Sequence, residues 1–215
     1  MERTVAGTAY PEAMPRAVTL PTTGFLLLAV LVQATDFDIL NSFARHHLQP
    51  LADGAGHPTL NSLAEALVTP AAPSIAVLAM AAAAALLWRT GRRRAALAWP
   101  AALAAGLLVE LVSKLVVQQH RSGVWHGYGL TLDSSFPSGH MLRAIVLAGV
   151  VAALWPRLQP WLAGWCVAVA VCLQLTGWHL PTDIAGGVLA GLALAACARW
   201  AVGGQLAVRG EVVRE

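Results

Sequence analysis

Charged residues are scarce in this sequence. Asp, Glu, Lys and Arg make up 12% of its 215 residues, whereas apolar residues make up 57% and the mean hydropathy is +0.63. An ordinary soluble domain carries about 25% charged residues. Because so little charge cannot cover a folded surface, the composition excludes a soluble monomer, a disordered chain and a nucleic-acid-binding module.

Lysine and cysteine are also scarce. Lys114 is the single lysine among 14 basic residues, which indicates either a need for an ammonium group there or a general preference for arginine codons. The three cysteines, Cys166, Cys172 and Cys197, all lie in apolar stretches. Structural disulfides are usually formed by paired cysteines in exposed, oxidising compartments. We therefore expect these three to be small apolar side chains rather than disulfide partners.

Long apolar runs, in contrast, are abundant. A helix that spans a bilayer needs about 20 mostly apolar residues. Six candidate spans are present, at residues 17–35, 66–88, 95–118, 138–155, 161–178 and 183–202. The segment 36–65 has apolar residues at helical spacing and is predicted to lie along the outer interface. The predicted fold is all-α: one domain, 1–215, with six transmembrane helices, an interfacial helical segment, and cytoplasmic tails at 1–16 and 204–215.

The basic residues are divided unevenly between the two sides of such a bundle. When alternate loops are assigned to one side, ten of the 14 fall on the side that holds both termini. The other four are Arg45, Lys114, Arg121 and Arg143. Because Lys and Arg are enriched in cytoplasmic loops, we expect cytoplasmic termini in a protein of the plasma membrane.

Two cations stand near the predicted outer end of the third span. Lys114 and Arg121 are seven residues apart, so they share one helix face about two turns apart. Charges in a membrane segment are costly and usually functional. Two cations on one face are suited to binding a phosphate.

Two further polar groups on the outer side contain histidine. The sequence PSGH at 137–140 is typical of a helix start, in which Ser138 caps the helix and Gly139 lets an anion approach free backbone N–H groups. His179 and Asp183 are four residues apart, so one helical turn brings the carboxylate to the imidazole. A carboxylate on one ring nitrogen leaves the other nitrogen free to attack.

Together these residues resemble the motifs of the type 2 phosphatidic acid phosphatase superfamily. That family has Lys, six residues, Arg-Pro; then Pro-Ser-Gly-His; then Ser-Arg, five residues, His, three residues, Asp. The matching positions here are Lys114 with Arg121-Ser122, then Pro137-Ser138-Gly139-His140, then Cys172-Leu173 with His179 and Asp183. The resemblance covers about residues 36–191 and includes the six-helix layout.

The resemblance implies hydrolysis of a lipid phosphate through a phosphohistidine. His179 would be the nucleophile, Asp183 would orient it, and His140 would protonate the leaving oxygen and then activate water. The phosphoryl oxygens would be held by Lys114, Arg121, Ser138 and Gly139. No metal or cofactor is expected. The partners would be the bilayer and a substrate of the polyprenyl, phosphatidate or phosphatidylglycerophosphate type.

Two positions depart from the family pattern. Ser122 replaces the proline of the first motif, and Leu173 replaces the arginine of the third, which is a phosphate ligand. Arg143 follows His140 by three residues and shares its helix face. We therefore expect Arg143 to supply the missing guanidinium.

The sequence leaves some alternatives open. Glu110, four residues before Lys114, is expected to pair with it and lower the cost of burying both charges. The missing arginine is also compatible with a catalytically weak protein that binds or moves lipid phosphates, or with a lipid phosphotransferase of the same family. A different class of function would be a metal or haem site built from His120, His126, His140 and His179.

Overall fold

The computed structural model describes residues 13–35, 38–44, 47, 58–117 and 134–211, and it confirms an all-α helical bundle. The helices are α1 (Ala13–Ala34), α2 (Asp38–Phe43), α3 (Pro58–Val68), α4 (Pro73–Arg89), α5 (Arg93–Val116), α6 (Gly139–Leu154), α7 (Gln159–Leu175) and α8 (Pro181–Glu211). Two short 3-10 helices, η3 (Thr69–Ala71) and η4 (Pro156–Leu158), precede α4 and α7.

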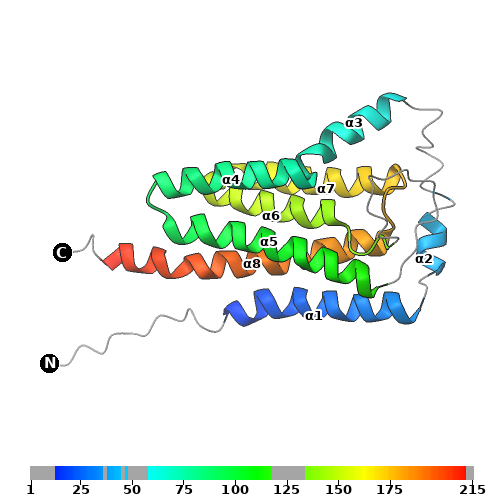
Figure 1. Ribbon diagram of the computed structural model, residues 1–215, viewed down its shortest axis with the longest axis horizontal. Helices are drawn as coiled ribbons and strands as arrows, with labels where there is room; N and C mark the ends of the chain where they lie inside the picture. Colours follow the sequence, from blue (N-terminus) through cyan, green and yellow to red (C-terminus); the bar gives the residue numbers. More distant parts are fainter. Residues whose placement is uncertain (1–12, 36–37, 45–46, 48–57, 118–133, 212–215) are drawn as a thin grey trace.

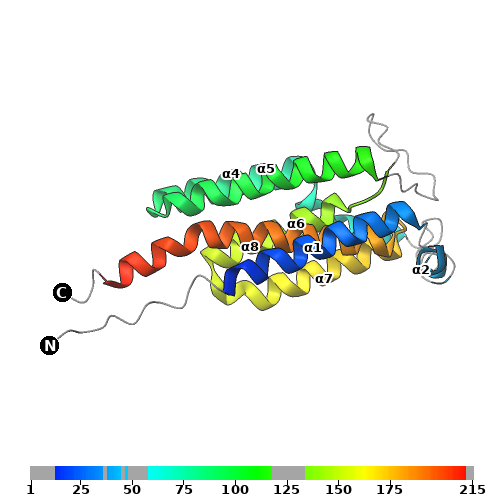
Figure 2. The same cartoon turned by 90° about the horizontal axis from the view of Figure 1, so that it is seen from below.

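Helix α8 is the centre of the arrangement, because it packs against α1, α5 and α6. The hairpin of α4 and α5 lies along one side of α8 (Figure 2), and α7 packs against α6. Helix α1 begins and α8 ends at the same end of the bundle (Figure 1). At the opposite end α5 and α7 finish while α6 and α8 begin, so four chain segments converge there.

The number of membrane spans is smaller than predicted. Within the described residues, four helices are long and apolar enough to cross a bilayer, namely Arg16–Ala34, Arg93–Val116, Pro156–Leu175 and Pro181–Gly203. A fifth is obtained only if the bent pair Asn61–Ala71 and Pro73–Arg89 is taken as one span. Several such helices indicate an integral membrane protein, but six spans are not found.

Two predicted spans account for the difference. The segment 66–88 was predicted as one helix, which is wrong, because α3 and α4 meet at a bend of 47°. Pro70 and Pro73 flank this break, and proline removes a backbone donor and clashes with the preceding turn. The predicted span 138–155 is a helix, but α6 has only 16 residues and ends at Leu154, because Pro156 disfavours a helical conformation at the preceding residue, Trp155.

The start of α6 is held tightly against the start of α8. A Cβ atom added to Gly187 would lie 2.5 Å from the carbonyl oxygen of Ser138, so the two backbones could not approach this closely with a larger residue. The backbone N–H of Ser138 donates a hydrogen bond to the carbonyl oxygen of Asp183 at 2.9 Å. These contacts fix the relative position of the two helix N-termini that carry the candidate site.

Candidate active site

The predicted site residues that the structure describes come together where α5 ends and α6 and α8 begin (Figure 1). Helix α5 contributes Lys114, and α6 with its cap contributes Ser138, Gly139, His140 and Arg143. His179 lies in the turn between α7 and α8, and Asp183 lies in the first turn of α8. Arg121 lies outside the described residues.

His179 and Asp183 form a buried pair. Gly177, with φ 68°, reverses the chain after α7, a conformation that glycine adopts without steric cost. The carboxylate of Asp183 accepts a hydrogen bond from the backbone N–H of Leu180 at 2.9 Å, and the same Oδ2 atom lies 3.4 Å from His179 Nδ1. His179 is 4% exposed and Asp183 is fully buried. The carboxylate thus lies next to Nδ1 of His179, and Nε2 is on the opposite side of the imidazole ring.

His140 faces this pair from α6. Its ring centroid lies 6.4 Å from that of His179, with an angle of 61° between the ring planes, and 6.5 Å from the ring of Trp178. His140 is half-buried. The two imidazoles are therefore close enough to contact one phosphoryl group from different sides.

The predicted helix start at 137–140 is confirmed. Ser138 is the N-cap of α6, and its Oγ accepts a hydrogen bond from the backbone N–H of Met141 at 3.4 Å. Gly139 is the first residue of the helix. A Cβ atom at this position would overlap the carboxylate of Glu110 on α5, so the glycine is required for the close approach of an anionic group.

Three charged side chains form a cluster beside Gly139. Lys114 Nζ lies 2.6 Å from Glu110 Oε1, which confirms the pair expected from their spacing. The Arg143 guanidinium donates a hydrogen bond from NH1 to Glu110 Oε2, and its Nε donates to the carbonyl oxygen of Ala71 at 2.7 Å. One carboxylate therefore bridges two cations.

Sequence reasoning did not predict the contact between Glu110 and Arg143, because the two residues are 33 positions apart on different helices. A signal for it was nonetheless present. An arginine within an apolar helix needs an anion or carbonyl partner, and acidic residues are rare in the apolar segments of this chain.

Leu173 occupies a different environment from Arg143. It is fully buried in an apolar cluster that includes Met141 and Ala144 of α6. A buried leucine thus occupies the position where the family motif has an arginine. The guanidinium of the charged cluster comes instead from Arg143 on α6. That Arg143 binds phosphate stays a prediction.

The residues that the structure describes do not include a cluster of ligands that would support the alternative of a metal site. No group of three His, Cys, Asp or Glu side chains in that part of the chain is placed to hold an ion. Of the four histidines named for such a site, His140 and His179 do lie together. His120 and His126 lie outside the described residues.

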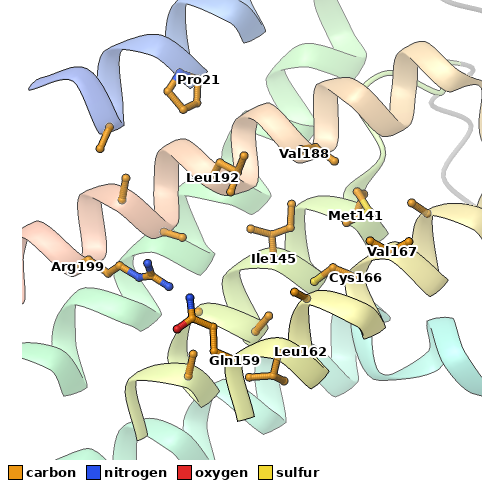
Figure 3. Close-up of a pocket in the computed structure, with 18 of the residues that line it drawn as sticks. Pro21, Met141, Ile145, Gln159, Leu162, Cys166, Val167, Val188, Leu192 and Arg199 are labelled. Atoms are coloured by element: carbon orange, nitrogen blue, oxygen red, sulfur yellow. The ribbon is translucent and has the colours of Figure 1, made fainter. Parts of the chain in front are cut away.

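An apolar cavity of about 890 Å³ runs along α6, α7 and α8 and reaches α1 (Figure 3). Met141, the residue after His140, lies at one end of this cavity together with Val167. Gln159 and Arg199 lie at the other end. The cavity therefore extends from the first turn of α6 toward the end of the bundle where α8 finishes, and none of the described candidate site residues lines it.

The comparison with family models gives one match. Residues 112–205 match the PAP2 superfamily, a stretch that begins within α5 and includes Lys114, the PSGH sequence and the pair of His179 and Asp183. A comparison with curated proteins found no match, and neither did a comparison with solved structures. Members of this superfamily are generally phosphatases. Residues 112–205 of this membrane protein are a PAP2 superfamily domain.

Proposed function

We propose that this protein hydrolyses a lipid phosphate or diphosphate through a phosphohistidine intermediate. The observation that carries the proposal is the arrangement of three side chains. Asp183 addresses one ring nitrogen of His179, and His140 faces the same ring. This is the arrangement required of an oriented nucleophile with a separate proton donor.

In the first step, His179 Nε2 attacks phosphorus and the bond between phosphorus and the lipid oxygen breaks. His140, protonated, gives its proton to that oxygen, so the lipid leaves as an alcohol or as a shorter phosphate. Asp183 stabilises the imidazolium character that develops on His179. In the second step, His140 takes a proton from water, the water oxygen attacks phosphorus, and the P–N bond breaks to release inorganic phosphate.

The remaining site residues would bind the phosphoryl oxygens. Lys114, Arg143 and the backbone at Gly139 surround one position, and Ser138 caps the helix that begins there. Cations and backbone donors that are held in place before the reaction stabilise the charge of the transition state. Arg121 completes this set in the proposal.

Two observations support a lipid as the substrate. The site lies at one end of a bundle of membrane-type helices, at the level where a lipid head group would be. The apolar cavity is lined at one end by Met141, the residue that follows His140 in the chain, so we propose that a hydrocarbon chain occupies it while the phosphate is at the site. Polyprenyl phosphates, phosphatidate and phosphatidylglycerophosphate are the substrates to test.

The proposed orientation follows from charge. The end of the bundle opposite the site carries exposed arginines, namely Arg16, Arg89, Arg92, Arg93, Arg94, Arg157 and Arg199. Because cytoplasmic loops are enriched in basic residues, this end would face the cytoplasm of a cell bounded by the plasma membrane. The active site would then act on the outer leaflet.

The experiment that tests this function is a phosphate-release assay on full-length protein purified in detergent, with the three lipid classes as substrates. His179→Ala should abolish release, whereas His47→Ala, which changes an exposed histidine, should retain it. The rate should have a bell-shaped pH dependence because two histidines act in different protonation states. Binding of a lipid phosphate without release would instead favour the lipid-binding alternative.

A further inference from the structure

The position of Glu110 is unexpected for a site that binds phosphate. A carboxylate repels phosphate, yet this one lies between the two described cations that are proposed to bind it. Both carboxylate oxygens are used, Oε1 by Lys114 and Oε2 by Arg143. Glu110 lies two residues before the segment that matches the PAP2 superfamily, so the match does not assign it a role.

The position of the carboxylate is that of a bound anion. It contacts the first residue of α6 so closely that a Cβ on Gly139 would overlap it. The backbone at a helix N-terminus attracts negative charge, and here the attraction is reinforced by the Lys114 ammonium and the Arg143 guanidinium. Glu110 therefore occupies the place that a phosphoryl oxygen would need.

The carboxylate is also placed so that it can leave. The side chain of Glu110 is 14% exposed and that of Lys114 is 17% exposed, whereas that of Arg143 is 3% exposed. Glu110 and Lys114 thus form the accessible edge of the cluster, and Arg143 forms its buried side. Rotation of the Glu110 side chain away from Gly139 would break both ion pairs and free the two cations.

We propose that Glu110 is a built-in competitor that fills the anion position until a phosphate of higher charge displaces it, and so selects terminal phosphates against phosphodiesters. The inference rests on the proposed function of the same site. It makes Glu110 a residue that determines specificity, not one that reacts with the substrate.

The selection follows from counting charges. Lys114 and Arg143 carry two positive charges, of which the carboxylate neutralises one. A phosphodiester, the linkage in ordinary bilayer lipids, also carries one negative charge, so its exchange for the carboxylate leaves the same balance. A phosphate monoester carries about 1.5 to 2 negative charges at pH 7 and can neutralise the pair. Bulk lipid would then be excluded although it is far more abundant than the substrate.

The test is the affinity of purified full-length protein for orthovanadate, measured by calorimetry without turnover. Glu110→Gln should bind vanadate about tenfold more tightly, a difference of about 1.4 kcal/mol. The matched control Glu65→Gln removes one charge from an exposed position of α3 and should bind like wild type. Unchanged or weaker binding by Glu110→Gln would overturn the inference, since a purely structural partner of the cations would give that result.

A second measurement tests the selection itself. Phosphatidylglycerol, an anionic phosphodiester lipid, is added to the micelles in which lipid-phosphate hydrolysis is assayed. It should raise the KM of Glu110→Gln at least about fivefold and leave the KM of wild type nearly unchanged, with little effect on kcat. Equal inhibition of both proteins would contradict the proposed selection.

Glu110→Asp keeps the charge and covers the case in which Glu110→Gln does not fold. Its shorter side chain withdraws the carboxylate from Gly139, so its vanadate affinity should lie above that of wild type, and wild-type affinity would count against the inference. The two proposals fail separately. Tighter vanadate binding by Glu110→Gln without any lipid hydrolysis would contradict the proposed phosphatase activity but support Glu110 as a competitor. His179-dependent hydrolysis together with weaker vanadate binding by Glu110→Gln would support the phosphatase activity and contradict the role of Glu110.

Discussion

The two ends of the bundle differ in how exposed their charged side chains are. At the site end, Arg143, Glu110 and Asp183 are buried or nearly so and are engaged in specific contacts. At the other end, seven arginines of the described residues are exposed (Arg16, Arg89, Arg92, Arg93, Arg94, Arg157 and Arg199). Removing an ion from water costs several kcal/mol unless it is well paired, whereas exposed charges cost little. We propose that the buried, paired charges serve the chemistry of the site and that the exposed arginines orient the protein in the membrane.

Among substitutions at the two ends, His179→Ala at the site end should have the largest effect on activity. Loss of the proposed nucleophile should lower kcat for lipid-phosphate hydrolysis at least about 10³-fold. The melting temperature in detergent should also fall, because the buried carboxylate of Asp183 loses its partner. The measurement is phosphate release under single-turnover conditions. A variant with more than a tenth of wild-type activity would remove His179 from the nucleophile role.

Arg143→Ala should have the next largest effect, and on stability as well as on rate. It leaves Glu110 with Lys114 alone, and removing one partner of a buried ion pair costs about 3 kcal/mol. Arg143→Lys should recover part of the stability but not the rate, because an ammonium lacks the planar fork of donors. The control is Arg157→Ala at the exposed end. Near-full turnover by Arg143→Ala would show that this guanidinium does not replace the one missing at Leu173.

Gly139→Ala should act through steric overlap. The added methyl group would meet the Glu110 carboxylate, so the cluster must open and kcat/KM should fall about tenfold. Gly164→Ala on α7 is the matched control, because a Cβ there has no heavy atom within 4 Å. Alanine is favoured over glycine in a helix by about 1 kcal/mol, so the control should be stabilised. Wild-type kcat/KM in Gly139→Ala would contradict the tight contact between α5 and α6.

The smallest effect should come from the exposed end. Arg94→Gln changes a solvent-exposed charge and should leave kcat/KM within about twofold of wild type, as surface substitutions usually do. Its effect should be on membrane orientation, which protease accessibility of the termini in sealed vesicles can measure. A large loss of activity in protein with normal orientation would mean that charge at this end serves the site.

Local signals in the sequence were enough to predict much of the site. The cap at Ser138, the pair of Glu110 with Lys114 and the proximity of Asp183 to His179 each depend on residues at most four positions apart. Such contacts follow from helix geometry alone. The order of apolar segments likewise predicted an all-α bundle.

Tertiary contacts decided the rest. The bend between η3 and α4 was not predicted, because the segment 66–88 was assigned as one span from its apolar composition alone, without regard to Pro70 and Pro73. The bridge from Glu110 to Arg143 depends on how α5 packs against α6, which no local pattern reports. The same packing places Gly139 against the carboxylate of Glu110. Glu110, which was expected only as a counter-ion of Lys114, therefore lies at the proposed anion position.

Rapid-quench trapping of a covalent intermediate tests the central claim most directly. Full-length protein is mixed with a lipid substrate labelled with ³²P at its terminal phosphate, quenched in base and digested for peptide mapping. The account predicts a base-stable, acid-labile label on His179 that appears before free phosphate and is absent from His179→Ala. Release of phosphate with no labelled protein at any time, or label on another residue, would contradict it.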